Sequence, residues 1–137
     1  MWHVGIDLHR RTIVLAAVND AGEAMKPITI PCADTAAIVN AVRALGPFRA
    51  VIEATGTYRW LYDLLHPCGT ILLAHPFRLR AMIQRRTKTD KLDAQLLANL
   101  LRINQIPLAT GTCRESGLTR NRCFAHERGC DWPERGD

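Results

Sequence analysis

Residues 4–20, VGIDLHRRTIVLAAVND, decide how the chain begins to fold. A short apolar run is followed by a second, β-rich run that ends in an Asn-Asp turn signal. The two runs predict the arms of a hairpin that turns around His9 to Arg11. EAMKPITIPC, at residues 23–32, predicts a weaker third strand, and Pro27 within it favours a sheet edge or a bulge.

The next part of the chain alternates between helical and extended patterns. DTAAIVNAVRALG predicts a short amphipathic helix with Asp34 as its N-cap and Gly46 as its stop. RAVIEATG and TILLAH, at residues 49–56 and 70–75, predict a fourth and a fifth strand. Thr57 is the expected cap of the helix between these two strands.

The last structured part is expected to be a single helix. PFRLRAMIQRR, at residues 76–86, is expected to form only a helical turn or loop, and Thr89 or Asp90 is expected to cap a helix running to about Ile106. The order β-β-β-α-β-α-β-α predicts the α/β class, with a mixed five-stranded sheet that carries helices on its faces.

The composition is that of one globular domain. With 137 residues, of which 47% are hydrophobic, the chain can bury one real core. This domain is expected to span residues 1–110, and the aliphatic-poor segment 111–137 is expected to be a poorly ordered tail. There is no run of eighteen apolar residues and no signal-peptide pattern, which predicts a cytoplasmic protein.

The basic residues are concentrated in one part of the chain. The formal net charge is +5; up to residue 110 there are thirteen Lys and Arg against eight Asp and Glu, and the remaining residues carry five of each. Six basic residues cluster around a single acid, which suits binding to a phosphate backbone. They are Arg78, Arg80, Arg85, Arg86, Lys88 and Lys91, and the acid is Asp90. The alternative is a solvated helix face followed by a basic loop.

Thr55, Gly56 and Tyr58 are further candidates for binding nucleic acid. They follow Glu53 where a strand enters a helix, and helix N-termini attract phosphate. The Tyr58 ring is able to stack on a base or to donate a hydrogen bond. The alternatives are that Gly56 serves the turn, that Thr57 caps the helix and that Tyr58 is a half-buried core residue.

Two aspartates have an unexpected place in RRTKTDKLDAQLLANLLR, residues 85–102. At about 100° per residue, Asp90 and Asp93 fall on the leucine-bearing half of the expected helix, which should face the sheet. Burying two carboxylates without a counter-charge costs on the order of several kcal/mol, so a cation is expected beside them. The alternative is that both lie in the first turn, where they cap the helix and stay solvated.

Two more acids end apolar strand patterns, Asp7 in VGID and Glu53 in AVIEA. An acid in such a run is disfavoured unless it has partners. If the first and fourth strands are adjacent, these carboxylates lie side by side, and the last helix can bring Asp90 and Asp93 over them. Four carboxylates predict a site for hard divalent cations, Mg²⁺ or Mn²⁺, of the kind that serves phosphodiester displacement.

Three stretches, GIDLHRRTIVLAAVNDAGE, VIEATGTYRWLYDLL and RRTKTDKLDAQLLANLL, resemble the N-terminal RuvC-like domain of the DEDD transposases, the insertion-sequence recombinases guided by a bridge RNA. The resemblance covers about residues 3–108. It implies a ribonuclease-H-like fold and an Asp-Glu-Asp-Asp tetrad that falls on Asp7, Glu53, Asp90 and Asp93. It also implies Mg²⁺, DNA strand cleavage and exchange, a guide RNA partner and homo-oligomers on nucleic acid.

The family's second domain, which supplies a nucleophilic serine, has no counterpart in this sequence. Ser116 matches no motif of that domain, so a shortened transposase is expected, and complete recombination by this chain alone is not. The alternative is a non-catalytic nucleic-acid-binding remnant. A sugar-kinase or actin-like ATPase also begins with a G-I-D strand, but such proteins need small residues after the acid, where this chain has Leu8, His9 and Arg10.

Overall fold

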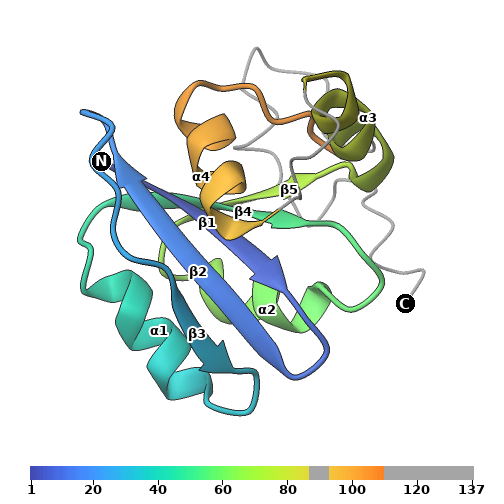
Figure 1. The fold of residues 1–137 in the computed structure, drawn as a ribbon. Coiled ribbons are helices and arrows are strands. Elements are labelled where there is room, and N and C mark those ends of the chain that lie inside the picture. The colour runs from blue at the N-terminus through green and yellow to red at the C-terminus, as the bar shows by residue number, and fades with distance from the viewer. Residues whose placement is uncertain (87–92, 110–137) are drawn as a thin grey trace, which may run out of the picture.

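The computed structural model describes residues 1–86 and 93–109, which form a mixed sheet with helices on both faces (Figure 1). The strands are β1 (Trp2–Leu8), β2 (Thr12–Asn19), β3 (Ile28–Pro31), β4 (Phe48–Glu53) and β5 (Thr70–Ala74). The helices are α1 (Thr35–Arg43), α2 (Arg59–Leu65), α3 (Pro76–Arg86) and α4 (Ala94–Arg102). The five strands lie in the order β3-β2-β1-β4-β5, and the predicted α/β fold class is confirmed.

β1 is the central strand, and it pairs differently on its two sides. On one side β2 is antiparallel and completes the predicted hairpin, in which the backbone N–H of His9 donates to the carbonyl of Thr12 at 2.9 Å. On the other side β4 is parallel, with Ile6 opposite Ile52. The predicted adjacency of the first and fourth strands is therefore confirmed, and β3 lies at the sheet edge that Pro27 favoured.

The alternation of side chains along the strands builds two separate cores. Val4 and Ile6 of β1 and Ile52 of β4 belong to the larger core, beneath α1 and α2. Val51 of β4 and Leu72 of β5 belong to the second core, beneath α3 and α4. The two helix pairs cover opposite faces of the sheet (Figure 1).

α4 lies directly on β1 because β1 has a glycine at the contact. A Cβ atom at Gly5 would overlap the carbonyl oxygen of Ala94 and would lie 2.8 Å from the Cβ of Leu97. Only a residue without a side chain lets the helix backbone approach so closely. The first turn of α4 is thereby placed over the middle of β1.

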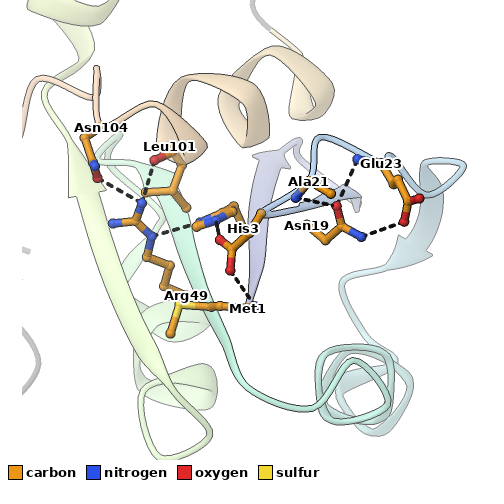
Figure 2. A network of polar contacts seen from close by, with 9 residues as sticks. Met1, His3, Asn19, Ala21, Glu23, Arg49, Leu101 and Asn104 are labelled. Carbon is orange, nitrogen blue, oxygen red and sulfur yellow. Dashed lines mark hydrogen bonds and ion pairs between the residues drawn. The ribbon is translucent and has the colours of Figure 1, made fainter.

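The other end of α4 is tied to the start of β4 by Arg49 (Figure 2). Nη2 of Arg49 donates to the carbonyl of Leu101 at 2.8 Å and to Oδ1 of Asn104 at 2.9 Å. Nε of Arg49 donates to Nδ1 of His3 at 2.9 Å, and Nε2 of this buried histidine lies 2.7 Å from Oδ1 of Asp20. Since its start lies over Gly5 and its end beside Arg49, α4 runs antiparallel to β1 and β4.

Two expected helix boundaries were wrong. Residues 76–86 form a full helix rather than a turn, because Leu79 and Ile83 lie one turn apart and both enter the second core. Nδ1 of His75 accepts a bond from the backbone N–H of Arg78 at 3.3 Å and so caps this helix. Tyr58, not Thr57, occupies the N-cap of α2, and its side chain makes no cap hydrogen bond.

The last helix is shorter than expected. It begins after Asp93 and ends at Arg102, and Asn104 takes a positive φ of 56° just beyond its end. Thr89 and Asp90, the expected caps, lie outside the described residues. Among the helices that the structure describes, none has the length and apolar character needed to cross a membrane.

Candidate metal site and nucleic-acid surface

Asp7 and Glu53 lie at the adjoining carboxyl ends of two parallel strands. The pairing of β1 with β4 runs to Ile6 and Ile52, so the next residue of each strand is one of the two acids. Side chains two apart in a strand share a face, so Asp7 follows Gly5 and Glu53 follows Val51 on the face that α3 and α4 cover. The two acids therefore adjoin each other beneath the same helix layer.

Asp93 is the N-cap of α4 and does not lie on the helix face predicted for it. Its Oδ1 accepts a hydrogen bond from the backbone N–H of Leu96 at 2.8 Å, and the residue is exposed. The structure therefore agrees with the alternative for Asp93, a solvated aspartate that caps the helix. Since α4 runs antiparallel to β1, its N-terminal end still points toward the strand ends that carry Asp7 and Glu53.

The described residues do not bring a complete tetrad together. Within residues 1–86 and 93–109, no three His, Cys, Asp or Glu side chains are close enough to hold a metal ion as a group. Asp90, the remaining acid of the expected tetrad, lies outside the described residues. The part of the candidate site that the structure describes is thus the pair Asp7 and Glu53, with Asp93 at the end of α4 that points toward these strand ends.

Among the described residues, each acid of the pair has a basic neighbour. Nε2 of His9, from the β1–β2 turn, lies 3.1 Å from Oδ2 of Asp7. Nη2 of Arg80, from α3, lies 3.2 Å from Oε1 of Glu53. The side chains of Asp7 and Glu53 are 21% and 14% exposed, whereas those of His9 and Arg80 are 54% and 62% exposed. The acids are thus largely sheltered, and their partners reach into solvent.

The carboxylate of Glu53 is poorly satisfied. Burial raises the pKa of Glu53; Arg80 opposes this rise, and the negative charge of Asp7 adds to it. Oε1 is buried and has no hydrogen-bond partner among the described residues, so the contact with Arg80 is an ion pair without hydrogen-bond geometry. A buried acceptor without a donor is costly, because its hydration is lost and not replaced.

This pair suits a hard divalent cation. Asp7 and Glu53 offer only carboxylate oxygens, the ligand type that Mg²⁺ and Mn²⁺ prefer. A cation at this place would engage the unsatisfied Oε1 of Glu53 and relieve the repulsion between the two charges. The residues present therefore fit such an ion.

The basic residues predicted to bind nucleic acid are only partly described. Arg78 and Arg80 are exposed on α3, so they are accessible to a phosphate backbone. Arg85 and Arg86 form the end of α3, but their side chains are outside the described part. Lys88 and Lys91 also lie outside the described residues.

The loop after Glu53 offers fewer groups for binding nucleic acid than expected. The backbone N–H of Tyr58 donates to the carbonyl of Thr55 at 3.2 Å, which closes a turn around the exposed Gly56. Tyr58 is 8% exposed and packs in the larger core, so its ring is not available to stack on a base. This corrects the stacking role considered for Tyr58 and agrees with the core alternative.

His9 is the site residue that the sequence did not single out. From the sequence it was expected only to belong to the turn of the first hairpin. The signal that was available is its spacing, since His9 lies two residues after Asp7 at the start of a tight hairpin turn. A residue in that position can fold back over the carboxylate at the strand end.

The strand order, with carboxylates at the adjoining ends of β1 and β4, is consistent with a ribonuclease-H-like fold. A family model described as a transposase, that of the IS110-type DEDD transposases, matches residues 4–116. The chain belongs to this transposase family, and it is a protein of DNA transposition and recombination. The family uses divalent metals and has DNA as its substrate. A search of curated proteins gave no match.

Proposed function

We propose that this chain is the catalytic domain of a DNA transposase that cleaves and exchanges DNA strands with the help of divalent metal ions, Mg²⁺ by preference. Asp7 and Glu53 would hold the ion from the sheet, and Asp93, with Asp90 of the same motif, would complete the ligand set. The observation that carries the proposal is the pair of adjoining, sheltered carboxylates with an unsatisfied Oε1 on Glu53.

The residues have separate tasks in this proposal. Asp7 and Glu53 provide the negative charge that binds the ions, and Arg78 and Arg80 hold the phosphate backbone that the acids alone would repel. When bound, such ions activate the attacking oxygen and stabilise the leaving oxygen of a phosphodiester displacement. The sheet fixes the acids because both belong to hydrogen-bonded strands rather than to loops.

The partners are proposed on the same basis. DNA is the substrate, and the resemblance adds a guide RNA and assembly into homo-oligomers. The exposed arginines of α3 are suited to either nucleic acid, because they contact phosphate and not base edges.

Titration of the full chain with Mg²⁺ or Mn²⁺ in a calorimeter tests the metal site. Saturable binding is expected, and Asp7→Asn and Glu53→Gln should each weaken it by at least about tenfold. Asp63→Asn is the matched control, because Asp63 is an exposed acid on α2, beneath the opposite face of the sheet. Equal affinity in wild type and both site variants would refute the metal site.

A second assay separates catalysis from binding. The chain is incubated with DNA and Mg²⁺, and strand cleavage is measured beside salt-dependent binding. Cleavage that is lost in Asp7→Asn supports the proposal. Binding without any cleavage would instead favour the non-catalytic nucleic-acid-binding alternative.

A further inference from the structure

The ion pair between Arg80 and Glu53 joins an exposed cation to a sheltered acid. Nη2 of Arg80 lies 3.2 Å from Oε1 of Glu53, and the arginine side chain is 62% exposed whereas the glutamate is 14% exposed. Arg80 therefore reaches in from solvent to an acid that the sheet holds in place. Most of its guanidinium group is still in water.

The contact of Arg80 with Glu53 is loose when it is compared with the contacts of Arg49, an arginine of β4. Arg49 donates three hydrogen bonds, to His3, Leu101 and Asn104. The contact of Arg80 with Oε1 of Glu53 is an ion pair at 3.2 Å, and no residue that the structure describes donates a hydrogen bond to this oxygen. Arg49 is thus held in place by its hydrogen bonds, whereas Arg80 can leave Glu53 with little loss of free energy.

We infer that Arg80 is a placeholder for the metal ion: it neutralises Glu53 until a divalent cation binds, and then turns to hold a nucleic-acid phosphate. This inference rests on the proposed function. A divalent cation on Glu53 would repel a guanidinium group a few ångströms away, because both are positive. The released Arg80 would join the exposed Arg78 on α3, and the phosphate-binding surface would gain a cation when the metal is present.

Metal affinity tests the first half of the inference. At about pH 8, where ordinary carboxyls are ionised, Arg80→Gln should bind Mn²⁺ about two- to fivefold more tightly than wild type. The reason is that the metal ion no longer has to displace the guanidinium group of Arg80 from Glu53. Arg80→Lys keeps a competing cation and should stay near wild type. Arg43→Gln is the control, since Arg43 is an exposed arginine of α1 with no assigned binding role, and the metal affinity of this variant should not change.

Nucleic-acid binding tests the second half. A single-stranded DNA oligonucleotide is titrated in Ca²⁺ and, separately, in EDTA, over a range of salt concentrations. In Ca²⁺, Arg80→Gln should reduce the salt dependence by about one phosphate contact, whereas in EDTA it should change little. Arg78→Gln should have the same effect in both conditions.

The outcomes distinguish this inference from the proposed function. If wild type binds metal, Glu53→Gln abolishes that binding and Arg80→Gln leaves the affinity unchanged or weaker, Arg80 is not a placeholder and the metal site stands. If wild type binds no metal, the proposed function itself fails. If Arg80→Gln loses the same amount of DNA binding in Ca²⁺ and in EDTA, the inferred move of Arg80 from Glu53 to a phosphate is also overturned.

Discussion

The carbonyl oxygen of Ala94 in α4 lies against Gly5 of β1 so closely that no side chain fits between them. A methyl group at Gly5 would have to push the helix off the sheet, because its neighbours are backbone atoms that cannot rotate away. Gly5→Ala is therefore expected to lower the free energy of unfolding by about 3 kcal/mol, as measured by urea denaturation. Gly56→Ala is the control, since nothing lies within 4 Å of a Cβ at that position, and it should cost less than about 1 kcal/mol. Similar losses of unfolding free energy in the two variants would contradict the close packing of α4 on Gly5.

Asp93 combines a capping role that the structure describes with a proposed metal role, and two substitutions separate them. Asp93→Ala removes the cap and should cost about 1 kcal/mol in unfolding free energy, whereas Asp93→Asn keeps a side-chain oxygen for the N–H of Leu96 and should cost little. If Asp93 also binds metal, Asp93→Asn should weaken Mn²⁺ binding without loss of stability.

Asp34 offers a matched comparison for Asp93. It caps α1 through a 3.1 Å bond from the backbone N–H of Ala37, and α1 packs on the face of the sheet opposite to the one that carries Asp7 and Glu53. Asp34→Ala should cost about as much stability as Asp93→Ala, and Asp34→Asn should leave metal binding unchanged. Unchanged metal affinity in Asp93→Asn as well would limit Asp93 to its capping role.

Arg49 is expected to be the main anchor at the end of α4. Arg49→Met keeps much of the side-chain volume but removes three hydrogen bonds and leaves Nδ1 of the buried His3 without its donor. A loss of about 2 to 3 kcal/mol in unfolding free energy is expected. Hydrogen exchange should increase at the last turn of α4, while the exposed Arg43→Met should change stability by less than about 0.5 kcal/mol. Unchanged exchange in Arg49→Met would show that the helix end is held by its apolar contacts instead.

Glu53 gives the metal-free protein a pH dependence of a defined sign. Because burial raises its pKa above the ordinary value of 4.5, the folded chain holds this proton more tightly than the unfolded chain. Stability should therefore fall as the pH rises from 4.5 through the raised pKa of the folded state. Glu53→Gln removes this loss, so in EDTA it should be more stable than wild type at neutral pH and similar to it in acid. Urea unfolding across this pH range checks the prediction, and a constant difference between the two proteins would contradict it.

The sequence predicted the sheet well, because its signals are local or pairwise. The hairpin around His9 follows from two apolar runs separated by a short polar turn, and the helix after Asp34 from a cap and a stop. The neighbouring positions of β1 and β4 follow from the usual crossover connection in a mixed sheet. These features predict the adjoining positions of Asp7 and Glu53 from the sequence alone.

The helices over the second core were predicted less well, because their limits depend on tertiary contacts. Residues 76–86 carry many charges, so the apolar pair Leu79 and Ile83 is a weak signal until β5 supplies a surface for it. Asp93 satisfies the pattern of a helix face and that of an N-cap, and only the backbone conformation distinguishes them. The contacts of His9 and Arg80 with the acids depend on side-chain positions that no periodicity encodes.

The residues that anchor α4 to the sheet are different from the carboxylates of the proposed metal site. Gly5 holds the first turn of the helix and Arg49 its last turn, and the carboxylates lie beyond the N-terminal end of the helix. Substitution of the acids by their amides should accordingly silence the chemistry while the fold and the exposed arginines of α3 are kept. Such an inert but intact protein would remain on its nucleic acid after encounter, and could be used to capture that nucleic acid for sequencing.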